Sequence, residues 1–276
     1  MLLVIPISSA DAHLLPDFTK NILRCGPLNS ANPEAPKHGI RIVPTHTVQE
    51  LGTKLANDLA PICPEIVVDP LDCDPIGGWP NACNIHFIKA STALWRAKIE
   101  RTWYWFELDN TPVSEGWLTA LSQEYMQARK PFMGAVVPTY GTRGDGSIVT
   151  NGKHMVGTGI YPNWWARDPK VWMTMPGNIP FDVYLQDMIV EQCHPTLKIQ
   201  HVGRTQNFTR HGHHIMYDDK LMPEGISYAS SIRPEAVVIH GCKDGSLARL
   251  LCGDAPPPAP KRRGRPPKNR PFLVTP

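Results

Sequence analysis

The stretch Trp103–Pro112, with the sequence WYWFELDNTP, constrains the fold of this chain more than any other feature. Four consecutive aromatic residues have to be buried, and so short a run suits a strand better than a helix. Side chains two positions apart on a strand point to the same face, so we expect Glu107 and Asp109 to project together where the apolar run ends. Two carboxylates at the C-terminal end of a buried strand suit a hard divalent cation, and open α/β sheets bind their ligands at this edge. The alternative is a pair of solvent-facing acids.

Strand and helix patterns alternate through the first half of the chain. Continuous apolar runs predict buried strands, and apolar residues at helical spacing predict helices. The resulting order is that of a doubly wound α/β half, and the sequence has neither GxGxxG nor GxxxxGK[ST], which argues against a dinucleotide-binding fingerprint and a P-loop. The predicted strands are 2–7, 40–44, 65–68, 103–109 and 132–137, and the predicted helices are 11–24, 47–59, about twenty residues ending near 101, and 114–129 with Ser114 as N-cap.

The pattern changes after residue 137. Residues 139–154 are Gly-rich and polar, which predicts a loop or hairpin. A helix over 181–193 and strands over 198–203 and 236–241 follow. Beyond Cys252 the sequence is Pro-rich and basic, cannot bury a core and is expected to be disordered. We therefore expect one domain with two halves and a tail, divided as 1–137, 138–253 and 254–276.

Charge and cysteine content narrow the class of protein. From Asp254 onward there are six basic residues and one acid, so the body keeps 22 of the chain's 28 basic and 24 of its 25 acidic residues, and the positive charge belongs to the tail. Seven cysteines without a CxxC pair indicate free thiols in a reducing compartment rather than a disulfide framework or a zinc ribbon. The N-terminus lacks the basic start and the long apolar run of a signal peptide, and no stretch is long enough to span a membrane. A cytoplasmic protein is expected.

A second polar cluster follows a late apolar strand, in the segment IHGCKDGSL, residues 239–247. His240 ends the strand, and its imidazole would complete a carboxylate-rich metal site. Gly241 permits a close approach of the backbone, and Lys243 can neutralise a diphosphate bridged by that metal. A histidine at a strand end is also often structural. The RHGHH segment offers three alternative third ligands: His211, His213 and His214.

These features together resemble the GT-A glycosyltransferases. The resemblance rests on the α/β half, on the Asp-x-Asp-like motif Glu107–Asp109 after the fourth strand, and on the late His-Gly-x-Lys that starts at His240. A glutamate in the first position departs from the commonest form. The resemblance implies a GT-A-like α/β fold with a mixed central sheet, in which 1–137 is the sugar-nucleotide-binding half and 138–253 the acceptor half. It further implies that Glu107 and Asp109 hold Mn²⁺ or Mg²⁺ on the donor diphosphate. His240 is similar to the third ligand of glycogenin-type members, in which the spacing is longer, and Lys243 to their diphosphate-binding lysine.

The same resemblance implies where the nucleotide base and ribose would lie. In this family they contact the end of the first strand and the loop before the third helix. Alternatively, the residues at these two places only shape the loops. The residues in these two places are Pro6, Ser8 and Asp11 in the first, and Gly78, Asn81 and Asn84 in the second.

Two acids of the segment PFDVYLQDM are candidates for the acceptor side. Asp182 opens the predicted helix over 181–193, where an acid is also favoured simply by the helix dipole. The resemblance implies that an acid at this place serves as base or acceptor ligand, with Asp182 as first candidate and Asp187 as second. An inverting enzyme needs such a carboxylate to take the proton of the acceptor hydroxyl, whereas a retaining enzyme does not.

The tail contains KRRGRPPK, residues 261–268, which resembles an AT-hook with its Arg-Gly-Arg-Pro core intact. An extended, proline-stiffened segment without a side chain at its glycine can lie deep in the narrow minor groove of A·T-rich DNA, with arginines along its floor. A generic basic tail or localisation signal is the alternative. The residues that would contact DNA are Arg262, Arg263, Gly264, Arg265, Pro266 and Lys268.

A GT-A-like body joined to a DNA-binding tail suggests that the acceptor is DNA. The leading hypothesis is a glycosyltransferase that moves a sugar from UDP-glucose or a similar donor to a hydroxyl-bearing, flipped-out modified base, and this resembles bacteriophage DNA-modifying enzymes, which work in the host cytoplasm. Three alternatives stay open: a glycan, lipid or protein acceptor; a non-catalytic DNA-binding protein; and a nucleotidyltransferase. The sequence decides neither the stereochemical outcome nor the oligomeric state.

Overall fold

The structure is a computed structural model, and it describes residues 1–254 except 33, 143–147, 166–174, 176, 203–231 and 244. The RHGHH segment and the AT-hook-like segment lie outside the described residues. None of the helices in the described ranges is both long and apolar enough to cross a membrane. The seven cysteines are all described, and all are free thiols, as expected.

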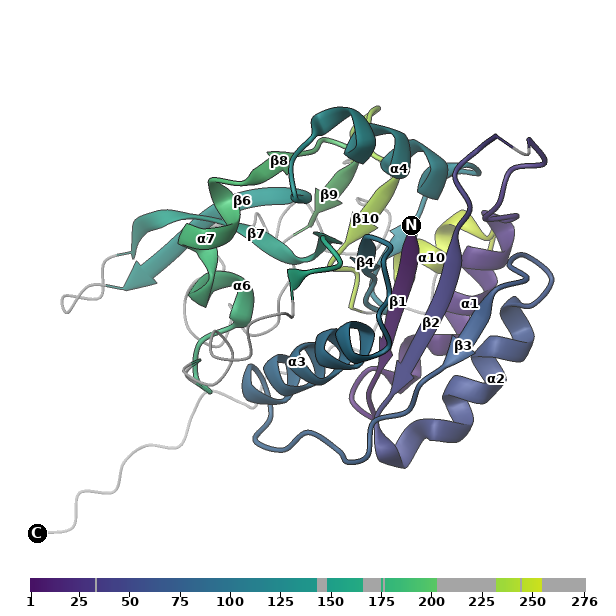
Figure 1. Cartoon of the computed structure of the whole chain (residues 1–276), viewed down its shortest axis with the longest axis horizontal. Helices are drawn as coiled ribbons and strands as arrows, with labels where there is room; N and C mark the ends of the chain where they lie inside the picture. The colour runs from purple at the N-terminus through teal and green to yellow at the C-terminus, as the bar shows by residue number, and fades with distance from the viewer. Residues whose placement is uncertain are drawn as a thin grey trace, which may run out of the picture.

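A seven-stranded mixed sheet forms the centre of the molecule (Figure 1). Its strand order is β3-β2-β1-β4-β7-β6-β8. The first four strands of this order are mutually parallel, β7 runs antiparallel to β4 and β6, and β8 is parallel to β6. The strands are β1 (Leu2–Ile7), β2 (Gly39–Pro44), β3 (Ile66–Val68), β4 (Trp103–Trp105), β6 (Phe132–Thr142), β7 (Ile148–Tyr161) and β8 (Cys193–Pro195).

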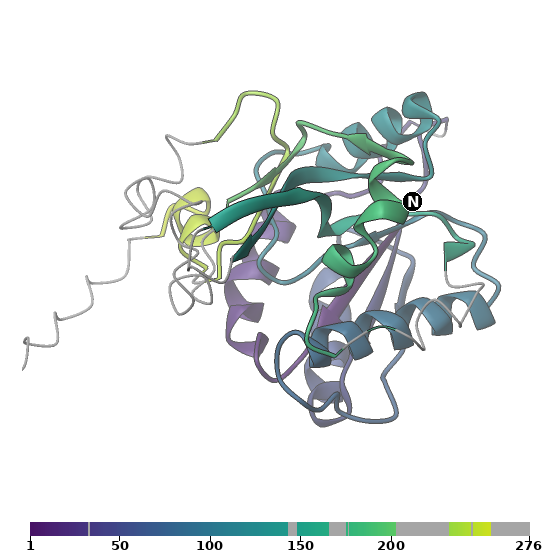
Figure 2. The same ribbon diagram turned by 90° about the vertical axis from the view of Figure 1, so that its left-hand side faces the viewer.

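Helices cover both faces of this sheet, as the two views show (Figure 1, Figure 2). One core packs α1 (Leu15–Arg24), α2 (Gln49–Leu59) and α4 (Trp117–Ala128) on the first face, and the other packs α3 (Asn81–Arg96) on the second. The aromatic run of β4 serves both cores. Trp103 and Trp105 enter the α3 core, whereas Tyr104 and Phe106 enter the α1 core, because alternate side chains of a strand point to opposite faces. The remaining helices are the 3₁₀ helices η1 (Ala12–Leu14) and η2 (His46–Val48), and α6 (Phe181–Tyr184), α7 (Gln186–Val190) and α10 (Ser246–Leu251).

A second, three-stranded sheet joins a segment from the middle of the chain to two strands from residues 199 to 240. Its order is β5-β10-β9, with β5 (Thr111–Pro112) antiparallel and β9 (Ile199–His201) parallel to β10 (Val238–His240). Because β5 follows β4 after a short turn, this small sheet brings the end of β10 beside the end of β4. The candidate site lies at this junction.

The predicted fold class is confirmed, with its mixed central sheet, and most strands lie where the apolar runs predict them. The described parts of the Gly-rich stretch, 139–142 and 148–154, belong to the antiparallel strands β6 and β7. The boundary between the expected halves, at 137/138, falls within β6, so one sheet runs through both halves. The predicted tail begins at residue 254, and its residues from 255 onward lie outside the described part of the chain.

Several predicted element ends were wrong. The fourth strand ends at Trp105 rather than reaching Asp109, because the chain leaves the central sheet there to form β5 in the small sheet. Helix α3 ends at Arg96 rather than near 101. Helix α4 is capped by Gly116 with a φ of 70°, two residues after the predicted Ser114. The helix expected over 181–193 is two short helices, and Cys193 begins β8 instead.

Candidate metal and nucleotide site

The two acids of the opening motif lie on a tight turn between β4 and β5. Phe106 N–H still donates to Val4 O (2.8 Å), and Asn110 N–H then donates back to Glu107 O (3.0 Å), which closes a four-residue turn. The Asn110 side chain donates to the same oxygen (3.0 Å). The two carboxylates therefore converge through this turn and not through the strand alternation from which their proximity was predicted.

Thr158 of β7 forms hydrogen bonds with this turn. Its hydroxyl lies 2.8 Å from Trp105 O and 3.1 Å from Asn110 Oδ1, and the side chain is fully buried. The central antiparallel strand thus fixes both ends of the segment that carries Glu107 and Asp109. Sequence reasoning missed Thr158, because nothing in the sequence indicates that β7 inserts beside β4.

His240 reaches the acids from the end of β10, and Gly241 makes this approach possible. Gly241 has a φ of +105°, and a Cβ atom there would lie 2.2 Å from Val202 O. Any other residue would clash with the neighbouring strand, so the predicted role of Gly241 in close backbone approach is confirmed. The chain then turns, with Lys243 N–H donating to Gly241 O (3.0 Å), and this turn returns the Lys243 side chain to the acids.

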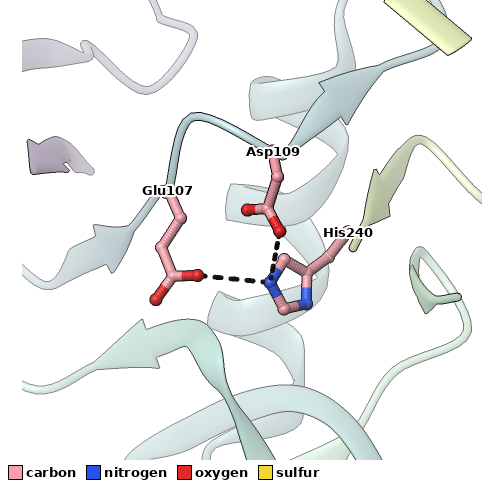
Figure 3. A group of neighbouring side chains, drawn as sticks. All are labelled: Glu107, Asp109 and His240. Atoms are coloured by element: carbon pink, nitrogen blue, oxygen red, sulfur yellow. Dashed lines mark hydrogen bonds and ion pairs between the residues drawn. The ribbon is translucent and has the colours of Figure 1, made fainter. Parts of the chain in front are cut away.

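Glu107, Asp109 and His240 point at one another (Figure 3). His240 Nε2 lies 3.3 Å from Glu107 Oε2 and 3.4 Å from Asp109 Oδ2, and one ligand atom from each residue falls within a 4.8 Å group. Lys243 Nζ lies 2.9 Å from Asp109 Oδ2 and 4.0 Å from Glu107 Oε2. Segments about 130 residues apart in the sequence are thus joined in one charged cluster.

Burial and charge oppose each other in this cluster. Burial disfavours the charged form of Asp109, but Lys243 and His240 outweigh it and hold the pKa of this carboxyl at about 2. The pKa of Glu107 is likewise lowered, since the hydrogen bond from His240 and the charge of Lys243 overcome burial. The same acids raise the pKa of His240 and of Lys243 against the effect of burial. Both carboxylates are therefore ionised at neutral pH.

The residues present fit a divalent cation. Asp109 Oδ1 is buried and has no hydrogen-bond partner within the described part of the chain, so one carboxylate oxygen is left for a further ligand. The Asp109 side chain is 0% exposed, whereas Glu107 and Lys243 are 30% and 43% exposed and form the open side of the cluster. Two carboxylates and one imidazole nitrogen are a donor set for Mn²⁺ or Mg²⁺, and the nitrogen favours the former.

Two further side chains hold the ligands in place and were not anticipated from the sequence. Trp105 Nε1 donates to Glu107 Oε1 (3.1 Å), which leaves Oε2 facing His240. His201 lies opposite His240 in the β9–β10 ladder, with their Nδ1 atoms 2.9 Å apart. The only sequence signal for His201 is its place at the end of a short apolar strand.

The end of β1 lies next to the acidic cluster, as expected for adjacent parallel strands. Ser8 Oγ donates to Asp11 Oδ2 (3.0 Å), and Asp11 directly precedes η1. Burial raises the pKa of Asp11, Lys243 opposes this rise, and the charges of Glu107 and Asp109 add to it. Pro6 is half-buried within β1 opposite Val43.

The three candidates before and within α3 differ in their surroundings. Gly78 is exposed, with a φ of +63° and no atom within 4 Å of a Cβ built on it. Asn81 donates to Ile76 O (3.0 Å) within its own loop. Asn84 is buried, donates to Ile179 O (2.8 Å) and accepts from Phe181 N–H (2.9 Å). Asn84 therefore ties α3 to α6 rather than facing solvent.

The two acceptor-side candidates lie in different environments. Asp182 Oδ2 accepts from Gly157 N–H of β7 (2.9 Å) and lies 4.0 Å from His154 Nε2. Burial raises the pKa of Asp182, the nearby His154 lowers it, and the charge of Glu107 raises it further, which links Asp182 to the metal cluster. Asp187 is exposed on α7 and has no such partners among the described residues. The structure thus brings Asp182 toward the cluster but not Asp187.

The rival third ligands His211, His213 and His214, and the tail residues from Arg262 to Lys268, lie outside the described residues. Among the described residues, the group that could hold a metal ion contains His240.

Comparison with solved structures places this architecture among known folds. The apo structure of mouse xyloside xylosyltransferase 1 matches with a TM-score of 0.50 at 13% identity, over 87% of this chain and 96% of that chain. The apo structure of the WbbM bifunctional glycosyltransferase matches with a TM-score of 0.54 at 10% identity, over 93% of this chain and 50% of that chain. The protein has a GT-A-like fold.

The likeness of this GT-A-like chain to the two structures is one of fold. No family model matches the chain, and a search of curated proteins finds no match either. The chain spans about half the length of the WbbM chain that it matches. What the GT-A-like fold does in this protein therefore has to be argued from its site.

Proposed function

We propose that the protein is a metal-dependent glycosyltransferase that uses a nucleotide-diphosphate sugar, with UDP-glucose or a similar UDP-hexose as the expected donor. The convergence of Glu107, Asp109 and His240 within one 4.8 Å group carries this proposal. The cluster lies at the C-terminal edge of the parallel strands, where α/β sheets bind nucleotides. The shared fold of two glycosyltransferase structures supports the same reading.

Each residue of the cluster has a role in donor binding. Glu107, Asp109 and His240 would hold the Mn²⁺ or Mg²⁺ ion, which when bound neutralises the diphosphate and stabilises it as a leaving group. Lys243, 2.9 Å from Asp109, neutralises the acids and supplies a second positive charge for the diphosphate. Ser8 and Asp11, beside the cluster at the end of β1, are the nearest candidates for contacts with the nucleoside. Pro6, Gly78 and Asn81 remain candidates on position, and Asn84 acts by positioning α6.

Asp182 is the proposed acceptor-side acid. Its side chain is only 15% exposed, it lies beside His154, and the charge of Glu107 acts on it, which supports an acceptor-side role near the same cluster. A raised pKa suits a group that accepts the proton of an acceptor hydroxyl while the acceptor oxygen attacks the anomeric carbon and the bond to the diphosphate breaks. Asp187 is the weaker candidate because it is exposed.

The proposed acceptor is a hydroxyl-bearing modified base in DNA, as in bacteriophage genomes, and the protein would then act in the host cytoplasm. The support is the Arg-Gly-Arg-Pro core at residues 263–266, which would hold the enzyme on A·T-rich duplex and raise the local concentration of acceptor. A glycan, lipid or protein acceptor leaves this tail unexplained.

Donor turnover is the test. Release of UDP from UDP-glucose would be measured with Mn²⁺, with Mg²⁺ and with a chelator, for the wild-type chain and for Asp109→Asn. Metal-dependent release that falls by about 100-fold or more in Asp109→Asn is expected, because a ligand is lost from the metal site. Asp58→Asn, the same change at an acid of α2 that pairs with Lys54, is the matched control and retains activity.

Other outcomes of this assay identify the alternatives. Release of pyrophosphate instead of UDP indicates a nucleotidyltransferase. If no donor turns over with any metal, and if donor binding is the same in wild type and Asp109→Asn, the protein is not an enzyme of this class and a non-catalytic DNA-binding function takes its place.

A further inference from the structure

His201 is a half-buried polar neighbour of the cluster, and donor binding gives it no role. It lies at the end of β9, opposite His240 of β10 in the parallel ladder, and the two rings are 4.9 Å apart at an angle of 34°. Their Nδ1 atoms are 2.9 Å apart, which is hydrogen-bonding distance. The other ring nitrogen of His240, Nε2, faces Glu107 and Asp109. His240 therefore has one nitrogen toward the acids and one toward His201.

This arrangement restricts where the protons can be. A cation at Nε2 of His240 needs the lone pair of that nitrogen, so the proton of the neutral ring has to be on Nδ1. That proton faces Nδ1 of His201, and a hydrogen bond forms only if Nδ1 of His201 is the acceptor. His201 must then carry its own proton on Nε2.

We infer that His201 is a positioning residue that fixes the tautomer and orientation of His240, so that Nε2 presents its lone pair between Glu107 and Asp109. The consequence is metal selectivity, because an imidazole nitrogen adds more to the affinity for Mn²⁺ than to that for Mg²⁺, which prefers oxygen. His201 thereby favours Mn²⁺. The inference rests on the proposed metal site but extends it to a residue that touches neither metal nor donor.

The backbone around the pair is rigid enough to hold it. Val202 N–H donates to His240 O (2.8 Å), and the close contact of Gly241 with Val202 O locks the two strand ends together. His240 is only 8% exposed, so water cannot easily replace His201 as the partner of its Nδ1. An acceptor that takes the proton of the other ring nitrogen orients metal-binding histidines in general.

Binding of the metal alone tests the inference. Calorimetric titrations with Mn²⁺ and with Mg²⁺, without donor, would compare the wild-type chain with His201→Leu and His201→Asn. Leucine has a similar volume but no acceptor, whereas the asparagine oxygen can take the place of Nδ1. His201→Leu is expected to lose about 10- to 100-fold in Mn²⁺ affinity, and less in Mg²⁺ affinity, and His201→Asn is expected to restore most of the Mn²⁺ preference. His194→Leu removes a histidine that contacts Glu124 instead, and it leaves both affinities unchanged.

The outcomes separate this inference from the proposed function. If wild type binds Mn²⁺ and both His201 variants bind it equally well, the role of His201 is wrong and the metal site stands. If both variants lose affinity for Mn²⁺ and Mg²⁺ equally, the accepting nitrogen is not what matters, and the inference is again overturned. If wild type binds neither cation, the metal site falls and the inference falls with it.

A measurement on the wild-type chain covers the case in which His201→Leu does not fold. Long-range proton–nitrogen NMR spectra of histidine-labelled protein with Mg²⁺ report which ring nitrogen carries the proton. A protonated Nδ1 in His240 together with a protonated Nε2 in His201 is the expected result. The opposite tautomer in either ring contradicts the inference.

Discussion

At the scale of single residues, Lys243 has two roles in the cluster: it stabilises the charge of Asp109, and it can contact a ligand. Its ammonium is the nearest cation to Asp109, and it keeps a buried carboxylate charged where burial alone would favour the neutral acid. The same ammonium is 43% exposed, so it can also meet a ligand arriving from solvent. Lys243 therefore competes with a metal ion for the acids and cooperates with it in binding a diphosphate.

These two roles predict opposite changes in Lys243→Met. The affinity for Mn²⁺ alone should stay the same or rise, because a competing positive charge is removed. The affinity for UDP in the presence of Mn²⁺ should fall by about 10- to 100-fold, the effect of losing a charge-assisted hydrogen bond. Calorimetry with each ligand measures both. Weaker Mn²⁺ binding with unchanged UDP binding would show that Lys243 supports the metal site and not the diphosphate.

The proposed acceptor-side role of Asp182 can be tested by a substitution of this carboxylate. Asp182→Asn keeps the shape of the side chain and removes the proton acceptor beside His154, so kcat for transfer should fall by about 100-fold or more while KM for the donor changes little. Steady-state kinetics with donor and acceptor varied separately test this. Asp58→Asn, at an acid of α2 that pairs with Lys54, again serves as the control. A change in donor KM alone would assign Asp182 to donor binding instead.

At the scale of elements, the site depends on a short strand followed by a turn. The sequence WYWFELD predicted the strand, its two buried faces and the nearness of the two acids, but it placed the acids on the strand itself. The actual turn depends on Thr158, whose strand β7 inserts antiparallel between β4 and β6. Such a pairing joins residues 48 to 53 positions apart, and local patterns carry no information about it. The partnership of His201 with His240 was hidden for the same reason.

The packing of α3 on the sheet predicts an acid-sensitive stability. His86 Nε2 of α3 donates to Val43 O (2.8 Å), so Nε2 carries the proton of the neutral ring, and burial lowers the pKa of His86 to about 4. The unfolded chain binds this proton near pH 6.5, so the stability that His86 contributes is complete above that pH and is lost as the pH falls toward 4. The loss for this one group is about 2 kcal/mol between pH 7 and 4.5.

Urea unfolding of the metal-free wild type and of His86→Gln at pH 7 and at pH 4.5 measures this contribution. Glutamine can donate to the same carbonyl but does not titrate. Between pH 7 and pH 4.5, the free energy of unfolding of His86→Gln should therefore fall by about 2 kcal/mol less than that of the wild-type chain. His38, also buried with a pKa lowered to about 4, adds the same acid sensitivity to both chains. Equal losses in both chains would contradict the prediction.

At the scale of the whole molecule, a single central sheet runs through both of the proposed halves. The proposed donor-side residues Asp11 and Glu107 follow β1 and β4, and the proposed acceptor-side Asp182 accepts a hydrogen bond from β7, the neighbour of β4. The alternation of elements in the sequence was sufficient to predict the parallel part of this sheet. The small sheet that brings His240 to Glu107 was beyond prediction, because it joins β5 to strands more than 80 residues later.

The tail gives the prediction for the whole chain. Electrophoretic shifts with A·T-rich and G·C-rich duplexes would compare wild type with two double variants of equal charge change. Arg263→Ala with Arg265→Ala should abolish the preference for A·T, because the minor-groove arginines are lost. Lys261→Ala with Lys268→Ala should weaken both duplexes alike and reduce the slope of log K against log salt by about 2. Equally weak binding of both duplexes by all three proteins would remove the argument for a DNA acceptor.

Glu107, Asp109 and His240 are proposed to hold a divalent cation on the diphosphate of a nucleotide. A crystal structure of the full chain with UDP and Mn²⁺, with the anomalous signal of manganese recorded, tests this proposal most directly. One anomalous peak is expected in direct contact with oxygens of Glu107 and Asp109, with Nε2 of His240 and with the diphosphate, and Lys243 is expected to turn toward the phosphates. A peak on His211, His213 or His214 instead, or bound UDP with no manganese at the three residues, would contradict it.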